Sequence, residues 1–286
     1  MRILITGSKG QLGQEFNRLK SSSKHEFLFT DLNQLNICSV FSISSYLSDK
    51  KIDCIINCAA YTDVRKAEIE RDKALNVNSI GVKNLVTYCE VNNIKLIHFS
   101  TDYVYNSNNS KPINEEEFIA PQNYYGFSKR EGEKYIENSK NESIVIRTSW
   151  LYSKYGNNFV NTIIDKSKTV ENLKVIDDQF GCPTYAKDLA EAVIKILEID
   201  KRLDEKAKIF NYSNIESTNW FNFAKKILLL YGSDKIIEPV DSEYFKDEVK
   251  RPTFSITSKQ KIIDTFNIEI NNWDKSLADY ITNDLK

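Results

Sequence analysis

The 286-residue chain is poor in glycine, histidine and methionine, with nine, two and one of them, and has no long apolar run. No run approaches the ~18 residues that span a membrane. The N-terminal segment reaches a glycine turn too early for a signal peptide. A net charge of −1 excludes the broad positive field that draws proteins to nucleic acid or anionic membranes. We therefore expect a cytoplasmic protein whose partners are neither nucleic acid nor membrane.

The five cysteines are odd in number and form no Cys-x-x-Cys pair. This pattern favours reduced thiols over disulfides. Because only two histidines accompany them, the sequence predicts no metal site.

Short apolar runs alternate with amphipathic stretches over the first 150 residues, which is the pattern of a parallel sheet wrapped by helices. Strands are predicted at 2–6, 26–30, 53–57, 95–100 and 144–148, and helices at 11–21, 39–48, 124–138 and in a long region ending at Cys89. Strands from Leu173 onward are expected to return to this first sheet. The predicted fold class is α/β, a Rossmann-type doubly wound parallel sheet with a smaller, interleaved C-terminal α/β portion. We assign residues 1–150 and 173–214 to a dinucleotide-binding domain, and residues 151–172 and 215–286 to a substrate-binding portion.

Three of the nine glycines lie between the first predicted strand and the first helix, at Gly7, Gly10 and Gly13. This is the context of a dinucleotide-binding turn, where glycine permits a tight turn, close approach to a pyrophosphate and close helix packing. The helix N-terminus that follows offers free N–H groups to phosphates. The alternative is a glycine-rich turn that binds no ligand.

Asp31 ends the second predicted strand, where a carboxylate reaches the ribose hydroxyls of adenosine. This favours NADH, because the extra phosphate of NADPH would meet a negative charge. Lys9 in the glycine turn offsets that repulsion, so the choice between NADH and NADPH stays open. The alternative is a solvated aspartate in a turn.

Tyr125 and Lys129 are four residues apart on a predicted helix and so share one face. An ammonium beside a phenol stabilises the phenolate, so we expect the pKa of Tyr125 to be lowered toward neutrality. Thr101 follows the fourth strand, at the sheet edge where α/β proteins bind ligands, and its hydroxyl can bind the oxygen that Tyr125 protonates. The alternatives are a coincidental helical pair and an ordinary strand-to-loop turn.

These motifs, in this order, resemble the extended short-chain dehydrogenase/reductases, and further segments resemble the dTDP-4-dehydrorhamnose reductases more narrowly. The resemblance covers residues 1 to about 258. The segments that carry it are Asn57-Cys-Ala-Ala-Tyr-Thr62, Ser100-Thr-Asp-Tyr-Val104, Arg147-Thr-Ser-Trp-Leu-Tyr152, Gly156-Asn-Asn-Phe159, Asp178-Gln-Phe-Gly-Cys-Pro-Thr184 and Arg251-Pro-x-x-Ser255.

The resemblance implies an oxidoreductase that uses NADPH or NADH to reduce the C4 ketone of a dTDP-linked 4-keto-6-deoxyhexose, dTDP-4-dehydro-L-rhamnose, for cell-surface polysaccharide synthesis. It implies Tyr125 as proton donor, Lys129 on the nicotinamide ribose, Asn78 in a water relay to Lys129, and Thr101 at the sugar carbonyl. The remaining implied cofactor contacts are Gly7, Gly10, Gln11, Leu12 and Gly13 at the pyrophosphate, Asp31 at the ribose, Asn36 and Ile37 at the adenine, and Ala60, Tyr61 and Thr62 at the nicotinamide half. The remaining implied substrate contacts are Asp102, Trp150 and Arg251, with ordinary core packing as the alternative for Trp150.

Two positions depart from the family pattern. Asn36 stands where the family has aspartate, and Arg65 stands where it has aspartate beside the active-site loop. We expect altered cofactor affinity from the first, and altered substrate preference or subunit contact from the second. Some relatives bind Mg²⁺ at a dimer interface, but no carboxylate cluster here supports a magnesium site, and a homodimer stays open.

Two other functions remain open from the sequence: a reductase of a UDP-linked keto sugar, and a non-catalytic NAD(P)-binding regulatory subunit. Retention of Tyr125, Lys129, Thr101 and Asn78 argues against the regulatory subunit. Of the nine glycines, only Gly132 and Gly232 lie outside every predicted site.

Overall fold

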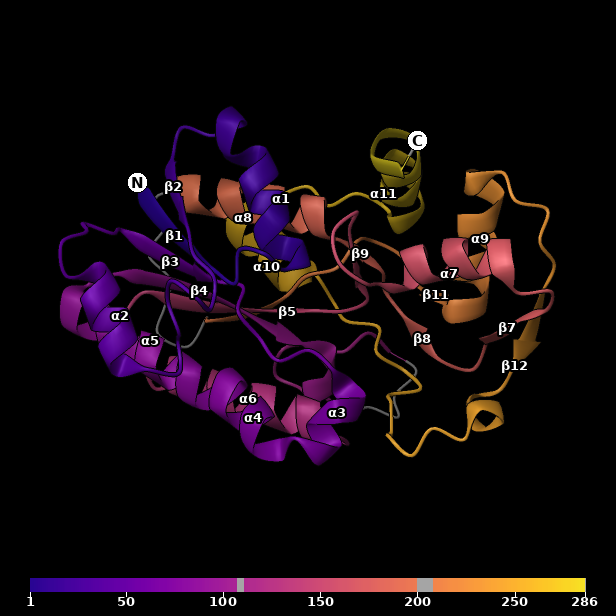
Figure 1. Cartoon of the computed structure of the whole chain (residues 1–286), viewed down its shortest axis with the longest axis horizontal. Helices are drawn as coiled ribbons and strands as arrows, with labels where there is room; N and C mark the ends of the chain where they lie inside the picture. Colours follow the sequence, from indigo (N-terminus) through magenta and orange to yellow (C-terminus); the bar gives the residue numbers. More distant parts are fainter. Residues whose placement is uncertain (107–110, 200–207, 286) are drawn as a thin grey trace.

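A six-stranded parallel sheet forms the centre of the larger lobe (Figure 1). The computed structural model describes residues 1–106, 111–199 and 208–285. The strands are β1 (Arg2–Thr6), β2 (Glu26–Phe29), β3 (Cys54–Asn57), β4 (Lys95–Thr101), β5 (Ser143–Thr148) and β10 (Ile209–Asn211). They lie in the order β2-β1-β3-β4-β5-β10, and every neighbouring pair is parallel. The predicted fold class is confirmed.

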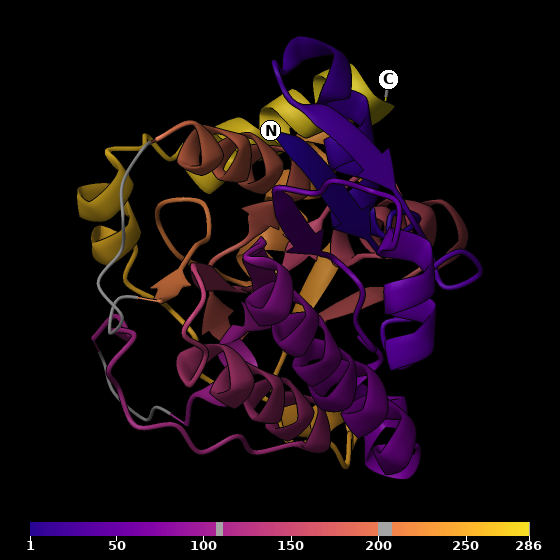
Figure 2. The same ribbon diagram turned by 90° about the vertical axis from the view of Figure 1, so that its left-hand side faces the viewer.

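Helices cover both faces of this sheet, as the two views show (Figures 1 and 2). One face carries α1 (Gln11–Leu19), α8 (Ala186–Glu198) and α10 (Gln260–Phe266), and the other carries α2 (Val40–Leu47), α5 (Gly81–Asn92) and α6 (Tyr124–Glu137). Alternate side chains of one strand enter the two cores: Ile3 and Ile5 pack under α1, and Leu4 packs under α2 and α5. Burial on both faces explains why these strands are apolar runs without alternation.

The long helical region predicted to end at Cys89 is divided in the structure. It consists of α3 (Val64–Ile69), α4 (Arg71–Leu75), the π-helical turn η2 (Asn76–Ile80) and then α5. A π-helical turn inserts an extra residue into the helix and turns neighbouring side chains toward a new direction. It lies directly before α5, at the end nearer the active-site candidates.

The smaller lobe is built from residues after β5 and has its own hydrophobic core. Its elements are β6 (Leu151–Tyr152), α7 (Phe159–Thr169), β7 (Leu173–Ile176), β8 (Phe180–Gly181), β9 (Thr184–Tyr185), β11 (Thr218–Asn219), α9 (Trp220–Tyr231), β12 (Ile237–Val240), η4 (Ser242–Phe245), α11 (Trp273–Tyr280) and η5 (Ile281–Leu285). The expected return to the first sheet is found for β10, which pairs with β5. It is wrong for β7, which pairs with β12 because α7 and α9 bury both strands in the hydrophobic core of the smaller lobe. Residues 200–207, inside the predicted dinucleotide-binding segment, lie outside the described residues.

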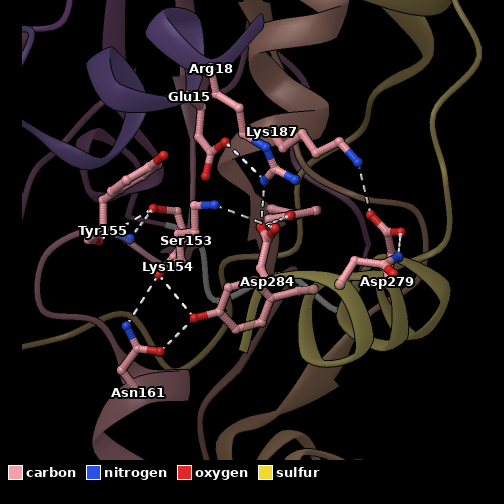
Figure 3. A network of polar contacts seen from close by, with 12 residues as sticks. Glu15, Arg18, Ser153, Lys154, Tyr155, Asn161, Lys187, Asp279 and Asp284 are labelled. Carbon is pink, nitrogen blue, oxygen red and sulfur yellow. Dashed lines mark hydrogen bonds and ion pairs between the residues drawn. The ribbon is translucent and has the colours of Figure 1, made fainter. Parts of the chain in front are cut away.

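A buried polar network connects the last turn of the described chain to α1 (Figure 3). Asp284 accepts hydrogen bonds from Arg18 of α1, at 2.6 Å, and from the hydroxyl of Tyr185. Lys187 of α8 forms a 3.0 Å ion pair with Asp279 of α11. The two lobes are therefore fixed to each other by charged side chains as well as by the covalent crossings. Among the described residues, no helix has both the length and the apolar character that a membrane crossing requires.

Candidate active site

The glycine turn between β1 and α1 folds back so tightly that two of its glycines leave no room for a side chain. Gly7 has a φ of +61°, and a Cβ there would lie 2.5 Å from the amide nitrogen of Ala59. A Cβ on Gly13 would lie 2.6 Å from the carbonyl oxygen of Gly7. Gly10 precedes α1, and no described side chain caps this helix. The N–H groups of its first turn are therefore available to a phosphate, so the turn fits a dinucleotide.

Gln11 and Leu12 follow the turn with different surroundings. The side-chain oxygen of Gln11 accepts a 3.1 Å hydrogen bond from Asn158, at the start of α7. Leu12 is buried in the core between α1 and the sheet. Gln11 therefore joins the glycine turn to the smaller lobe, and Leu12 anchors the helix that carries it.

Asp31 lies just past the end of β2, beside the glycine turn. The amide of Ser8 donates to the carbonyl oxygen of Thr30 at 3.0 Å, which holds the turn against this strand end. The ammonium of Lys9 lies 3.8 Å from the Asp31 carboxylate, so the charge compensation expected from the sequence is present. An adenosine ribose bound over α1 would meet a carboxylate that is already paired with a cation.

Asn36 and Ile37 lie beyond Asp31. The side-chain oxygen of Asn36 accepts a hydrogen bond from the amide of Cys38, so it shapes the chain there. Ile37 is buried against α5, where a Cβ on Gly81 would collide with its side chain.

Asn78, in the π-helical turn, holds the Ala60–Thr62 segment in place. Its side-chain oxygen accepts from the amide of Tyr61 at 2.8 Å, and its side-chain nitrogen donates to the carbonyl oxygen of Tyr61 at 2.9 Å. The same nitrogen donates to the hydroxyl of Ser128, between Tyr125 and Lys129 on α6. Gly132 permits this approach, because a Cβ there would collide with the carbonyl oxygen of Asn78. Asn78 therefore connects the loop predicted to line the nicotinamide with the helix of Tyr125 and Lys129.

Thr101 and Asp102 lie buried at the end of β4 and the start of the short turn η3 (Asp102–Val104). The Thr101 hydroxyl donates to Asp102 at 3.0 Å, while the other carboxylate oxygen of Asp102 has no hydrogen-bond partner in the described structure. Burial raises the pKa of Asp102 to about 6, and the hydrogen bond from Thr101 only partly opposes this. Asp102 is therefore partly protonated in mildly acidic solution.

Tyr125 adjoins Thr101, but its pKa moves opposite to the sequence-based expectation. Desolvation raises the pKa of Tyr125 to about 12, and the hydrogen bond with Thr101 only partly offsets this. The ammonium of Lys129 donates instead to the carbonyl oxygen of Phe99 at 2.6 Å. The predicted lowering is therefore wrong, and Tyr125 is a neutral phenol near pH 7, the form that can donate a proton.

Lys129 is itself buried, and burial lowers its pKa to about 8, against Glu133 and Cys58, which raise it. His98 of β4 lies behind it, with 3.5 Å between the His98 Nε2 and the Lys129 Nζ. Asn57 of β3 contacts the other ring nitrogen of His98 at 3.0 Å. Sequence reasoning missed both residues because they are single polar positions inside apolar strands. What could have revealed them is their position, because each is a polar residue close to the C-terminal end of a buried parallel strand.

A cavity of about 1080 Å³ opens between the two lobes, and Thr101, Asp102, Tyr125 and Lys129 are not among the residues that line it. Thr62 and Arg251 from the predicted set line it, together with Trp220, which sequence reasoning missed. Trp150 does not line this cavity but stacks on Trp220 with ring centroids 3.4 Å apart. Its backbone has a φ of +46°, and a Cβ on Gly181 would lie 2.7 Å from its ring. Trp150 therefore supports the cavity wall from behind.

Arg65, one of the departures from the family pattern, is among the residues that line this cavity. Its guanidinium donates to one carboxylate oxygen of Asp247 at 3.0 and 3.1 Å. Arg251 donates to that same oxygen at 3.1 Å. These two arginines lower the pKa of Asp247 against the opposing effect of its partial burial. Two cations thus converge on one carboxylate that lines the cavity.

The geometry separates the predicted site residues into three groups. Thr101, Asp102, Tyr125 and Lys129 meet at the C-terminal end of β4, with Asn78 linking them to the Ala60–Thr62 segment. The glycine turn and Asp31 lie beside the end of β1, and Arg251 lies across the cavity in the smaller lobe. Among the described residues, no group of three or more histidine, cysteine, aspartate or glutamate side chains could hold a metal ion.

A glycine turn at the first strand and a Thr–Tyr–Lys group at the fourth, both on the C-terminal edge of a Rossmann-type sheet, define a short-chain dehydrogenase/reductase. The family model described as "RmlD substrate binding domain" matches residues 1–285, and the chain belongs to this family.

Relatives of known name extend over nearly the whole chain. The dTDP-4-dehydrorhamnose reductase of Aggregatibacter actinomycetemcomitans is 35% identical, covering 96% of this chain and 97% of that protein. A dTDP-4-dehydrorhamnose reductase structure from Clostridium acetobutylicum is 36% identical, with a TM-score of 0.92 and 98% of each chain covered. A structure of the Bacillus anthracis reductase in complex with NADP is 34% identical, with a TM-score of 0.91 and 98% of each chain covered. The predicted family and the predicted class, an NAD(P)H-dependent oxidoreductase, are confirmed.

Proposed function

We propose that this chain is a cytoplasmic enzyme that reduces the C4 ketone of dTDP-4-dehydro-L-rhamnose to dTDP-L-rhamnose with NADPH or NADH. Tyr125 donates the proton, Thr101 holds the carbonyl oxygen and Lys129 binds the nicotinamide ribose. The observation that carries this proposal is the meeting of these three side chains at the end of β4, in the same parallel sheet whose β1 leads into the glycine turn. The names of the relatives from A. actinomycetemcomitans and C. acetobutylicum support the substrate.

The cofactor supplies a hydride to the carbonyl carbon when bound. The glycine turn and the uncapped start of α1 would hold its pyrophosphate, and Asp31 its adenosine ribose. The pairing of Lys9 with Asp31 at 3.8 Å leaves room for either NADH or NADPH, because the cation compensates the carboxylate. The NADP bound in the B. anthracis relative supports NADPH as one of the cofactors.

The protein's own contribution to the reaction is to hold the proton donor in its neutral form and to orient the ketone. A phenol with a pKa of about 12 is fully protonated near pH 7. As negative charge develops on the carbonyl oxygen, Tyr125 transfers its proton there, and Thr101 steadies the same oxygen. Lys129, one turn farther along α6, can return a proton to the phenolate that remains.

The test is a kinetic comparison of wild type and Tyr125→Phe, with dTDP-4-dehydro-L-rhamnose and either NADPH or NADH. We expect the variant to lose turnover by about 10²-fold or more, the size of a general-acid contribution, while cofactor affinity stays within a few-fold. Near-wild-type turnover would refute the role of Tyr125.

The same assay separates the other functions. Faster turnover of a UDP-linked keto sugar would show that this sugar, rather than the dTDP-linked one, is the substrate. Binding of the cofactor without its oxidation in the presence of either keto sugar would indicate a regulatory subunit. Phe127→Leu, on the same helix and partly exposed, is the matched control for an aromatic change outside the site.

A further inference from the structure

Three buried polar side chains on neighbouring strands form a chain that ends at Lys129. Thr6, Asn57 and His98 are paired across β1, β3 and β4, and each is almost fully buried. The Thr6 hydroxyl donates to the side-chain oxygen of Asn57 at 2.6 Å. The side-chain nitrogen of Asn57 lies 3.0 Å from Nδ1 of His98, and Nε2 of His98 lies 3.5 Å from the Lys129 Nζ.

Backbone geometry decides which atom of Asn57 faces His98. The amide of Ala59 can only donate, and it donates to the Asn57 side chain at 3.2 Å, so the atom it meets is the oxygen. The NH₂ group of Asn57 therefore faces His98 Nδ1. Because an amide nitrogen cannot accept, Nδ1 must be the acceptor and carries no proton.

A neutral imidazole has one N–H, so the proton of His98 is on Nε2, facing Lys129. An ammonium also offers only N–H groups, and two donors do not bind each other. The distances agree, because the Lys129 Nζ stays 3.5 Å from His98 while it approaches the Phe99 carbonyl oxygen to 2.6 Å. A neutral amine, in contrast, has a lone pair that accepts the Nε2–H.

We propose that His98 is a positioning residue for Lys129: Asn57 fixes its Nε2–H tautomer, and this N–H favours the neutral amine of Lys129 over the ammonium. The inference rests on the proposed function, in which Lys129 serves the reaction of Tyr125. The effect is to make Lys129 a readier proton donor, which restores the phenol of Tyr125 after each transfer. In that step an N–H bond of Lys129 breaks, an O–H bond of Tyr125 forms, and the lone pair left on nitrogen accepts from His98. A proton from solvent then restores the ammonium of Lys129 before the next turnover.

The other groups around Lys129 are consistent with this assignment. Burial and Lys129 together lower the pKa of His98 well below its ordinary value, so the ring stays neutral. Burial raises the pKa of the Cys58 thiol, which leaves it uncharged beside Lys129. Glu133 on α6 is the anion that opposes loss of the proton, but it binds Arg147 at 2.7 and 2.9 Å and Arg130 at 3.0 Å.

The tautomer can be observed directly, because the chain contains only two histidines. We would label histidine rings with ¹⁵N and assign the two rings with a His25→Gln variant. We expect Nδ1 of His98 to be unprotonated and Nε2 protonated from pH 6 to pH 9. We also expect the Nε2 signal to shift with a midpoint at about pH 8, from Lys129, and this step to vanish in Lys129→Met. A proton on Nδ1, or a doubly protonated ring in this range, would overturn the inference.

Two substitutions measure the consequence for the reaction. His98→Leu removes the N–H, and His98→Gln keeps an N–H donor at the end of a side chain of similar reach. We expect the pH profile of kcat to move upward by about one unit in the leucine variant, the size of one hydrogen bond. The glutamine variant is expected to return it toward wild type. Equal profiles in all three proteins, or a downward shift, would contradict the proposal.

Failure of the inference and failure of the proposed function give different results. If no ketosugar is reduced but the Nε2–H tautomer and the Lys129-dependent step are present, the function is wrong and the His98 assignment stands. If dTDP-4-dehydro-L-rhamnose is reduced and Nδ1 carries the proton, the proposed function stands and the His98 assignment is wrong. The spectroscopic test uses folded wild-type protein, so it holds even where His98→Leu does not fold.

Discussion

Glu15 offers a test of how burial in α1 controls stability. Its side chain is fully buried, neither carboxylate oxygen has a hydrogen-bond partner in the described structure, and the nearest cation, Arg18, lies 3.6 Å away (Figure 3). Burial raises the pKa of Glu15 to about 7 from its ordinary value of 4.5, while Arg18 opposes this. Between those pH values the folded protein keeps a proton that the unfolded chain loses. The free energy of unfolding therefore falls as pH rises from about 4.5 to 7, and stays lower above that.

The size of the effect follows from the shift. At ~1.4 kcal/mol per pKa unit, a rise from 4.5 to about 7 corresponds to about 3 kcal/mol, of which roughly 2–3 kcal/mol develops between pH 5 and pH 8. Glu15→Gln is neutral at every pH and nearly the same size. We therefore expect the variant to gain roughly 2–3 kcal/mol of stability relative to wild type over this range.

Urea unfolding at pH 5, 6, 7 and 8, followed by circular dichroism, measures this difference. Glu171→Gln is the matched control, since Glu171 is exposed and its neutralisation should leave the pH dependence unchanged. If the difference between Glu15→Gln and wild type is the same at every pH, Glu15 is ionised throughout. The Arg18 pair would then outweigh burial, and the reasoning would be refuted.

Two further substitutions, the first with a matched control, test the cofactor turn and the cavity. Gly13→Ala places a Cβ 2.6 Å from the Gly7 carbonyl oxygen, so we expect NADPH affinity to fall about tenfold or more in a fluorescence titration. Gly232→Ala, at a φ of +81° with open space around it, should cost roughly 1–2 kcal/mol of stability and leave that affinity unchanged. Asp247→Asn weakens the hold on Arg65 and Arg251, so we expect the KM of an anionic sugar nucleotide to fall a few-fold, most at low salt. A raised KM would instead indicate that Asp247 orients these arginines for the substrate.

Local sequence patterns were sufficient for the sheet and for the glycine turn. Strands buried on both faces read as apolar runs, and a turn that collides with any side chain at two positions requires glycine there. The spacing of Tyr125 and Lys129 placed both on one helix face, as found. These features depend on neighbours within a few residues along the chain.

Tertiary surroundings determined the rest. The pKa of Tyr125 rises because of desolvation, and Lys129 turns to Phe99, which helix spacing does not encode. Trp150 meets its stacking partner Trp220 only through the packing of the smaller lobe. β7 leaves the first sheet to pair with β12, which lies more than sixty residues farther along the chain and so is not visible in a local pattern.

The bond between Arg18 and Asp284 has a consequence for the order in which the protein is made. α1 follows the glycine turn directly, and its Arg18 finds its 2.6 Å partner in a turn made more than 260 residues later. The sheet beside it likewise waits for β10 to cover the edge of β5. Until then, the apolar face of α1 and the edge of β5 lack part of their cover in a nascent chain, and chaperones can recognise such surfaces. The segment of the glycine turn and α1 is therefore synthesised long before the contacts that complete its packing.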